Sequence, residues 1–583
     1  MLKLASARRI TMNIFIVSTC ASVFVILFDN GNCLAFVKKA EYNRSLQVKT
    51  NTGIVQGIWK KMDSGKDMFT YTGIPFAMPP LYNLRFMSPQ PPKSWSGVLD
   101  ARLQTPPCVQ LMLRIVGITV NGTEDCLYLN VYTPIKPLEN EIIPVLFWIH
   151  GGAFIEGDLA NFDPEYFLEE NLVVVTANYR LGMFGFLSTQ DEAAPGNYAL
   201  KDQNAVLRWI KKNIKNFGGD PDRVTIMGQS AGACSVMYHM VSPMSRGLFH
   251  RAVAMSGDSL TLWCSQRYPR NVAKDISVHM GLSMENTTSF VEALKRMDSQ
   301  RLMYGQVVPI LINLAQVYQN GLAFTPVIEC DHKDAFLTES SYSLLENGKF
   351  ARVPLIIGTT SMEMIFFKEA ILPIKPLILL VLELSPSLIS IGMNISSFSQ
   401  RRIVARKIKN RYIHAESIRS ATNEELIRYL TDVFYVKSTH KSMELITKYE
   451  DIPVYMYVFD YEGQASIDYL NSLNYRLIRD VKGAAHVEDL AYIWKKVSLN
   501  EKDKLIKSRL IRIWTNFIKY GNPTPVVDGL LQNVTWPSIT NSNFASYLYI
   551  GENLSVRQNY RENYMQFWNE LFQKYCQKPF NTY

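Results

Sequence analysis

The sequence lacks internal repeats, low-complexity tracts and Ser/Gly-rich linkers, and this favours one large domain over a string of small ones. It also lacks a dense block of basic residues, because charged residues make up only 19% and the net charge of +9 is spread thinly. We therefore expect no nucleic-acid partner. With 583 residues, 47% of them hydrophobic, the chain can bury a large core.

Residues 1–35 have the pattern of a secretory signal peptide. Basic residues precede an uncharged apolar run, and small or polar residues follow it. The run is short for a membrane-spanning helix, which needs about 20 residues, so we favour cleavage near Cys33 or Ala35 over a membrane anchor. We expect residues 36–583 to be secreted and to have no stable membrane span.

A secreted chain should carry N-glycosylation sequons and cysteines suited to an oxidising compartment, and both are present. Sequons begin at Asn43, Asn121, Asn286, Asn394, Asn533 and Asn553.

Among the cysteines, Cys108 and Cys126 are the nearest pair beyond the signal segment. Closing the loop between them would stabilise the fold by about 3 kcal/mol, so we predict a disulfide there. Cys234 lies in an apolar helical segment, and we expect a buried small side chain without a disulfide partner. The pairing of the other cysteines is left open: Cys264, Cys330 and Cys576.

Apolar runs of strand length alternate with helical patterns, an order typical of an α/β fold with a mostly parallel sheet covered on both faces. These runs lie at residues 142–149, 172–176, 224–227, 354–357, 454–459 and 547–550. Leu207, Ile210 and Ile214 recur at helical spacing, which predicts an amphipathic crossover helix over residues 200–216. A helical pattern at residues 564–575 is expected to pack back on the sheet.

The segment Gly228-Gln229-Ser230-Ala231-Gly232 follows one of these strands and opens a helix. A Ser on such a tight turn projects its hydroxyl away from the backbone, and the flanking glycines let the turn close. The alternative interpretation is an ordinary Gly-rich loop. We predict a nucleophile at Ser230, provided that the rest of a hydrolytic site exists.

A second Gly-rich segment, His150-Gly151-Gly152-Ala153-Phe154, follows the strand that ends at Ile149. It should therefore lie at the carboxyl edge of the sheet, where open α/β folds bind ligands. The backbone N–H groups of Gly152 and Ala153, with that of Ala231, would form a three-donor oxyanion hole.

A serine nucleophile needs a base and a carboxylate that orients the base. His486 lies in a small-residue loop, Gly483-Ala484-Ala485-His486, that can bring an imidazole over the sheet edge. His239 is the main rival, but nine residues along a helix from Ser230 it should point away. Glu363 follows closely on a predicted strand and is the candidate acid, although strand-end carboxylates are commonly helix caps or surface charges.

Ser230, Glu363 and His486 follow the nucleophile, acid, base order of α/β-hydrolases. Over nearly its whole length after the signal segment, the chain resembles the type-B carboxylesterase and cholinesterase family. The motifs that carry the resemblance are TGIPFA (72–77), LRF (84–86), EDCLYLNV (124–131), HGGAF (150–154), NYRLG (178–182), FGGDP (217–221) and GQSAG (228–232).

The resemblance implies a single α/β-hydrolase domain with a Ser-His-Glu triad at these three residues. It also implies a Cys108–Cys126 disulfide, a largely apolar gorge above the sheet, and ester hydrolysis through an acyl-serine without metal or organic cofactor. The chain departs from the family pattern where Ala153 replaces a third Gly and Met364 replaces the Gly after the acid. Ala153 still has an N–H to donate, so we expect the oxyanion hole to persist.

The segment between Cys108 and Cys126 contains no Trp, so a quaternary ammonium lacks its main cation–π platform. The sequence therefore favours nonquaternary, largely apolar small-molecule esters. Gln229 before the nucleophile, together with Gly483-x-x-His486-x-x-Asp489, resembles insect juvenile hormone esterases. Both features also occur in general insect carboxylesterases, so hormone hydrolysis is the first alternative. A catalytically silent adhesion member of the family is the second. Oligomeric state is left open.

Residues 371–389 are unusually apolar and are interrupted by prolines. They are interpreted either as a gorge wall or lid, or as helical core beneath the gorge, and we favour the core.

Overall fold

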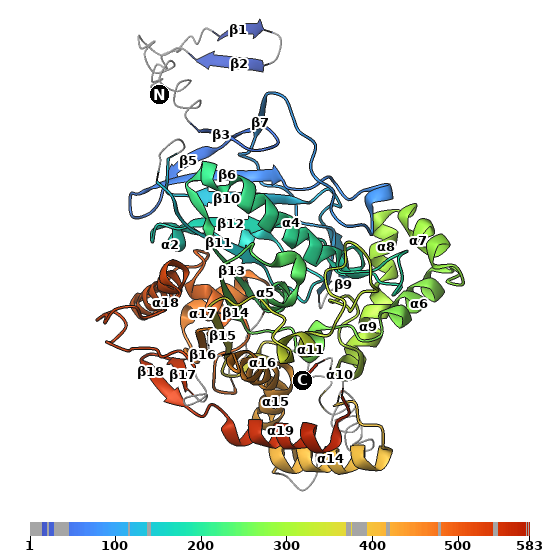
Figure 1. The fold of residues 1–583 in the computed structure, drawn as a ribbon. Coiled ribbons are helices and arrows are strands. Elements are labelled where there is room, and N and C mark those ends of the chain that lie inside the picture. Colours follow the sequence, from blue (N-terminus) through green and yellow to red (C-terminus); the bar gives the residue numbers. More distant parts are fainter. Residues whose placement is uncertain are drawn as a thin grey trace, which may run out of the picture.

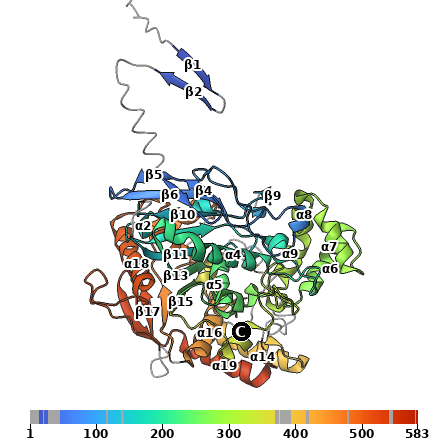
Figure 2. The same cartoon turned by 45° about the horizontal axis from the view of Figure 1, so that its top comes forward.

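The structure is a computed structural model of the whole chain. It describes residues 46–114, 117–136, 141–368, 375, 393–414, 420–449, 451–475, 480–539, 546–578, 580 and 582–583, and the strands β1 (Ile14–Thr19) and β2 (Ser22–Leu27). These two strands pair antiparallel within the predicted signal segment and stand apart from the body in both views (Figures 1 and 2). The predicted cleavage position and, apart from Lys375, the apolar segment 371–389 lie outside the described residues.

Within the described part of the chain, one sheet of eleven strands runs through the body (Figure 1). From edge to edge its strands are β18 (Leu554–Gln558), β17 (Ser546–Ile550), β16 (Val454–Phe459), β15 (Leu355–Thr360), β14 (Arg251–Met255), β13 (Gly219–Gln229), β11 (Ile143–Ile149), β12 (Val173–Ala177), β10 (Tyr128–Thr133), β6 (Asp67–Pro75) and β5 (Ile58–Lys61). The strands from β17 to β12 are parallel, and β18, β10, β6 and β5 add antiparallel edges.

All six strands predicted from apolar runs are present: β16 has the predicted bounds, and the other five have shifted ends. The sequence analysis missed β14, a five-residue strand in which Ala252 and Ala254 have low strand propensity. It also missed the antiparallel edge strands and two smaller sheets. The smaller sheets consist of β3 (Gln47–Lys49), β4 (Ile54–Gln56) and β7 (Val98–Asp100), and of β8 (Gln110–Arg114) with β9 (Gly117–Asn121).

Helices cover both faces of the large sheet. They are α2 (Glu165–Leu168), α3 (Gly182–Phe186), α4 (Tyr198–Asn213), α5 (Ala231–Val241), α6 (Pro269–Met280), α7 (Thr287–Lys295), α8 (Ser299–Gly305), α9 (Val307–Ala315), α10 (Val317–Asn320), α11 (Ser341–Glu346), α14 (Phe398–Tyr412), α15 (Asn423–Thr431), α16 (Lys437–Thr447), α17 (Gln464–Ser472), α18 (Glu501–Tyr520) and α19 (Glu562–Tyr575). The short turns used below are η3 (Ile214–Phe217), η5 (Leu262–Cys264), η6 (Glu363–Ile365), η10 (Asp432–Val436) and η11 (Glu488–Tyr492).

The alternation of side chains along β11 shows how the two faces are filled. Phe147 and Ile149 pack in the core that includes α4 and α5, whereas Leu146 and Trp148 pack in the core that includes α18. Because successive residues of a strand point to opposite faces, a central strand between two helical layers must be apolar throughout. This explains why the predicted strands are continuous apolar runs.

The predicted crossover helix is confirmed as α4, extended by the turn η3. Gly218 ends it in a left-handed conformation (φ 80°), which glycine adopts without strain. The final helical pattern is confirmed as α19, but its expected packing on the sheet is wrong. The helix α19 lies against α14 and α16, and α16 in turn lies against β15, so α19 belongs to an outer layer. Among the described residues, no helix combines the length and apolar character needed to cross a membrane.

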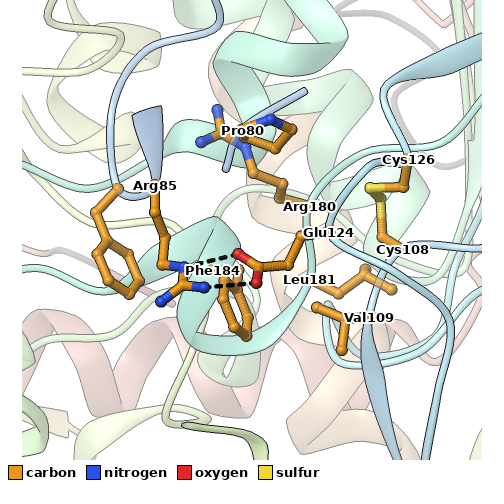
Figure 3. Close-up of a pocket in the computed structure, with 10 residues that line it drawn as sticks. Pro80, Arg85, Cys108, Val109, Glu124, Cys126, Arg180, Leu181 and Phe184 are labelled. Carbon is orange, nitrogen blue, oxygen red and sulfur yellow. Dashed lines mark hydrogen bonds and ion pairs between the residues drawn. A yellow bond between two sulfur atoms is a disulfide. The ribbon is translucent and has the colours of Figure 1, made fainter. Parts of the chain in front are cut away.

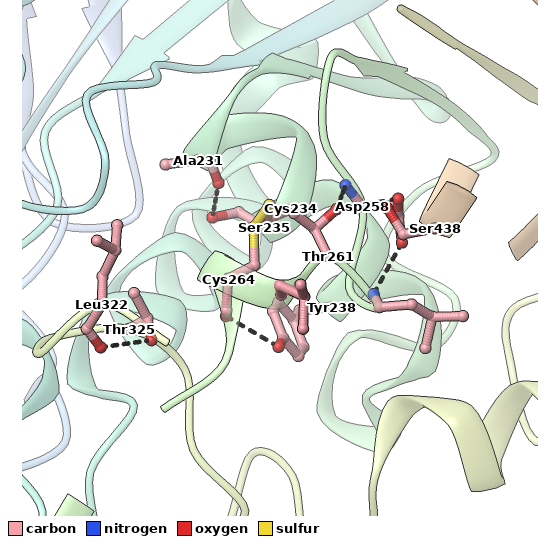
Figure 4. The surroundings of a disulfide bond; sticks show 12 residues. Ala231, Cys234, Ser235, Tyr238, Asp258, Thr261, Cys264, Leu322, Thr325 and Ser438 are labelled. Atoms are coloured by element: carbon pink, nitrogen blue, oxygen red, sulfur yellow. Dashed lines mark hydrogen bonds between the residues drawn. A yellow bond between two sulfur atoms is a disulfide. The ribbon is translucent and has the colours of Figure 1, made fainter. Parts of the chain in front are cut away.

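The disulfide between Cys108 and Cys126 is present as predicted. The prediction for Cys234 is wrong: this residue is buried, but it forms a disulfide with Cys264 (Figure 4). The chain after β14 returns over the start of α5, so that η5 lies beside the helix and Tyr238 Oη donates to the Cys264 carbonyl at 3.0 Å. A contact made by this return path has no signature in the local sequence.

We predict that peptide mapping without reduction recovers a Cys234–Cys264 cross-linked peptide. Replacing both residues by Ala should lower the free energy of unfolding by about 3–4 kcal/mol, because the disulfide closes a loop across a sequence separation of 30. Chemical denaturation of the double variant measures the loss. Recovery of Cys234 as an alkylated free thiol from native protein would contradict the assignment.

Candidate active site

The site lies where the parallel strands β11, β13, β14 and β15 end. These strands are neighbours in the sheet, so the segments that follow them all emerge at its carboxyl edge. The loop beginning at His150 follows β11, Ser230 follows β13, and Glu363 lies three residues beyond β15. The fold therefore brings together segments that are far apart in the sequence.

Ser230 occupies a strained turn between β13 and α5. Its φ of 58° and ψ of −123° lie outside the usual regions for a residue with a side chain. The two flanking glycines are required by space, since a Cβ on Gly228 would lie 2.4 Å from the Gly232 carbonyl oxygen, and one on Gly232 would lie 2.0 Å from the Ile149 oxygen. The Ser230 N–H donates to the Met255 carbonyl at 2.8 Å, which ties the turn to β14.

Glu363 and His486 form a direct pair. His486 Nδ1 lies 2.6 Å from Glu363 Oε2, and both side chains are almost completely buried. The other carboxylate oxygen, Oε1, accepts the N–H of Thr360 at 2.8 Å, and the His486 N–H donates to the Glu363 carbonyl at 3.1 Å. The carboxylate is thereby held so that it accepts the Nδ1 proton, which leaves the Nε2 lone pair of the neutral ring available.

The backbone at Met364, where the family pattern has Gly, accommodates a side chain. It is a buried residue in the short helix η6 and is absent from the residues with positive φ, so this position does not require glycine. Its N–H donates to Thr431 Oγ1 at 3.3 Å.

The structure does not join Ser230 to His486. Among the hydrogen bonds of the described residues, none links Ser230 Oγ to the imidazole, and Nε2 instead lies 3.2 Å from the side-chain nitrogen of Gln229. Catalytic hydrogen bonds are commonly absent or long in unliganded enzymes and form when substrate binds. The sequence analysis missed this contact, although it used Gln229 in the comparison with juvenile hormone esterases.

The loop after β11 adopts a conformation that leaves backbone N–H groups free to bind a ligand. Gly152, Ala153 and Phe154 all have positive φ, and a Cβ on Gly152 would lie 1.9 Å from the Glu156 carbonyl oxygen. The N–H groups of Gly152 and Ala153 donate to no carbonyl among the described residues. The N–H of Ala231, the first residue of α5, has no acceptor within the helix. These three amides are therefore available to a ligand.

Two other histidines hold structure in place. Burial lowers the pKa of His150 to about 4, and its ring stacks on Tyr179 at 4.2 Å, while Tyr179 Oη donates to the His150 carbonyl. Burial lowers the pKa of His239 to about 3, and its two ring nitrogens are engaged by Ser245 and Gln203. Both imidazoles are neutral at physiological pH, and His239 has no free ring nitrogen for catalysis.

Aromatic rings surround the imidazole of His486, and the sequence analysis missed them. The ring centroids of Phe366, Phe367 and Tyr435 lie 5.8, 6.1 and 5.1 Å from that of His486. Phe366 also packs on Tyr475 at 4.5 Å. Phe366 and Phe367 follow closely on Glu363, so the sequence could have indicated aromatic side chains near the candidate acid. Tyr435 comes from η10, and nothing in its local sequence indicates a contact with His486. The ring of side chains makes the surroundings of His486 apolar.

A pocket away from the site explains two of the motifs (Figure 3). Arg85 makes a bidentate pair with Glu124, with contacts of 2.6 and 2.7 Å, beside the Cys108–Cys126 disulfide. The remaining nitrogen of Arg85 donates to three main-chain carbonyls. A buried charge satisfied in this way anchors the chain and makes breaking the pair costly. None of Ser230, Glu363 and His486 lines this pocket.

The sheet order, the strained serine turn and the His–Glu pair define the α/β-hydrolase fold. The carboxylesterase family model matches residues 44–568. Venom carboxylesterase-6 from Apis mellifera is 32% identical, with 96% of this chain and 98% of that protein covered. Juvenile hormone esterase from Tribolium castaneum is also 32% identical, with 84% and 85% covered.

Among solved structures, the crystal structure of juvenile hormone esterase from Manduca sexta, with OTFP covalently attached, is similar with a TM-score of 0.78. The two are 27% identical, and the match covers 91% of this chain and 99% of the other. The chain therefore belongs to the carboxylesterase family. It is an enzyme of that class, a carboxylic-ester hydrolase.

Asp489 is a second buried carboxyl close to the pair. Tyr457 Oη donates to its Oδ2 at 3.3 Å, while Oδ1 has no hydrogen-bond partner among the described residues. Burial, together with the negative charge of Glu363, raises the pKa of Asp489 to about 7. This carboxyl is therefore largely protonated below neutral pH, so that two buried negative charges do not face each other.

We predict that Asp489→Asn removes one pH-dependent contribution to stability. Between the pKa of an unfolded Asp, about 3.9, and the folded value of about 7, only the folded protein holds this proton, so the contribution of Asp489 to stability falls as pH rises. The stability of the Asn variant relative to the wild type should therefore rise by up to about 4 kcal/mol from pH 4 to pH 7 and then level off. Urea denaturation at a series of pH values measures this, and a constant difference would contradict it.

Proposed function

We propose that the protein is a secreted serine esterase that acts through an acyl-serine with Ser230 as nucleophile, His486 as base and Glu363 as the orienting acid. The observation that carries the proposal is the 2.6 Å His486–Glu363 pair at the sheet edge where Ser230 emerges on its strained turn. The available amides of Gly152, Ala153 and Ala231 on the adjoining segments support it.

In the proposed mechanism, Ser230 Oγ attacks the ester carbonyl carbon while its proton moves to His486 Nε2. Glu363 stabilises the imidazolium, and the three amides hold the oxyanion, each contributing about 3–4 kcal/mol to the transition state. The imidazolium proton then passes to the departing alkoxide, and the alcohol leaves. Water, deprotonated by the same imidazole, then attacks the acyl carbon. The imidazolium returns the proton to Ser230 Oγ as the acyl C–O bond breaks, which releases the acid and restores the free serine.

The proposed substrate is a nonquaternary, largely apolar ester. The aromatic rings of Phe366, Phe367 and Tyr435 around His486 support an apolar partner. The absence of Trp between Cys108 and Cys126 argues against a quaternary ammonium.

Juvenile hormone is the alternative substrate. The similarity to two juvenile hormone esterases supports it. The comparably strong similarity to Venom carboxylesterase-6 means that this similarity does not single out the hormone.

Secretion is supported by the signal-like segment 1–35, by two disulfides and by the sequons. Five of the sequon asparagines are exposed and accessible to a glycan: Asn121, Asn286, Asn394, Asn533 and Asn553. The sixth, Asn43, lies outside the described residues.

The silent adhesion alternative is disfavoured because family members of that kind typically lack the nucleophile or the base. Here Ser230 and His486 are both present, and His486 is paired with Glu363.

We predict that Ser230→Ala lowers kcat for a short-chain aryl ester by about 10⁴- to 10⁶-fold and abolishes labelling by an organophosphate. The wild type should be phosphylated at Ser230, as detected by peptide mass spectrometry. Ser341→Ala is a matched control, because this serine on α11 is buried and its hydroxyl has no hydrogen-bond partner among the described residues. The substitution should leave both turnover and labelling unchanged. Wild-type protein that neither turns over nor is labelled would overturn the esterase proposal.

We further predict that kcat/KM for simple aliphatic esters equals or exceeds that for juvenile hormone. Parallel assays with secreted, purified protein at one pH give the ratio. A preference for the hormone of a hundredfold or more, which corresponds to about 2.7 kcal/mol, would require contacts specific to it and would favour the alternative.

A further inference from the structure

Gln229 is the last residue of β13 and is only 2% exposed. Its side-chain nitrogen lies 3.2 Å from His486 Nε2. Because Glu363 accepts the proton on Nδ1, the neutral imidazole presents a lone pair at Nε2, and the Gln229 amide donates to it. This is the same lone pair that has to receive the proton of Ser230.

The other end of the amide lies against the oxyanion loop. Gln229 Oε1 lies 3.0 Å from the point that a Cβ on Gly151 would occupy, and the Gln229 carbonyl oxygen lies 2.7 Å from it. Gly151 therefore leaves the space in which the glutamine side chain lies between the loop and the imidazole. A buried side chain held on both sides has few alternative rotamers.

We propose that Gln229 is a positioning residue that holds His486 in its resting state, as the neutral ring protonated on Nδ1, and releases Nε2 when Ser230 reacts. This inference rests on the proposed function. In the step itself the Ser230 O–H bond breaks, the Nε2–H bond forms, and the serine oxygen bonds to the acyl carbon. The glutamine keeps its own protons and loses only its hydrogen bond.

A donor aimed at Nε2 favours the neutral imidazole over the imidazolium, since the charged ring would place one N–H against another. The residue at position 229 should therefore influence the pH at which the base becomes active. Among the described residues, the ionisable groups near the ring or near its Glu363 partner also include Tyr435 on η10, Tyr457 on β16, Tyr560, and Glu488 and Asp489 on η11. All of them, and Glu363 itself, are unchanged in the variants below.

Two variants of similar size distinguish the effect of the Gln229 hydrogen-bond donor from the effect of its side-chain volume. Gln229→Met keeps the bulk and removes the donor, and Gln229→Glu replaces the donor with a carboxylate that favours the imidazolium. For hydrolysis of a short-chain aryl ester, we expect the midpoint of the acid limb of kcat/KM to move to higher pH. The expected shift is about 0.4–1 unit for Met and more than about one unit for Glu, with the high-pH plateau within tenfold of the wild type.

Gln203 provides matched controls. It is a buried glutamine whose Oε1 lies 3.0 Å from a ring nitrogen of His239, away from the reacting groups. Gln203→Met and Gln203→Glu should change stability without moving the midpoint of kcat/KM.

A uniform loss of activity at every pH in both Gln229 variants, or unshifted midpoints, would overturn the positioning role and leave the esterase proposal intact. Failure of the wild type to label with organophosphate at Ser230 would instead refute the function on which the inference rests. Should the Met variant fail to fold, as judged by thermal denaturation, the nearly isosteric Glu variant carries the test.

Discussion

Parallel pairing of β11, β13, β14 and β15 is the constraint on which the site depends. Each strand is buried on both faces, so its register with its neighbours is set by apolar packing above and below the sheet. Parallel neighbours end at a common edge, and the groups that follow them meet there without any local attraction between them. Glu363 follows β15 at this edge, and His486, 123 residues further along the chain, reaches it from the segment between α17 and η11.

The same edge concentrates backbone strain. Ser230, Ala153, Phe154 and Ser256 all have positive φ, a conformation that costs a residue with a side chain of order 1–3 kcal/mol. The surrounding sheet and helices hold these turns in place, and the strain exposes a hydroxyl and amides that regular structure would cover. Glycines are needed where a neighbouring backbone comes too close for a Cβ, as at Gly152. The sheet therefore supplies the rigidity, and the loops supply the chemical groups.

The charge state of the groups around His486 depends on burial. Glu363 is stabilised by the Thr360 amide and by the imidazole, whereas the nearby Asp489 has only a weak partner and has its pKa raised. Burial, together with the charge of Glu363, raises the pKa of Asp489, and the single hydrogen bond from Tyr457 only partly offsets this rise. Neutral His150 holds the loop after β11 without adding charge to it.

Features encoded in contiguous residues were predicted well. The Ser230 turn, the loop after His150 and the helix α4 each depend on local glycines or on local periodicity, and the sequence shows both. Features that depend on where distant segments of the chain pack, or that have a weak local pattern, were missed. The Cys234–Cys264 disulfide depends on the path after β14, and the short strand β14 itself has little apolar signal.

The sequence by itself determined six strands of the large sheet, the tight turn at Ser230 and the order of the candidate site residues, because each depends on neighbouring side chains or on glycines at defined steps. Only the tertiary structure decided that His486 pairs with Glu363, that aromatic side chains such as Phe366 and Tyr435 surround it, and that Gln229 occupies its free nitrogen. These contacts join segments from different strands and helices. Their geometry is set by sheet register and core packing, which no single stretch of the chain contains.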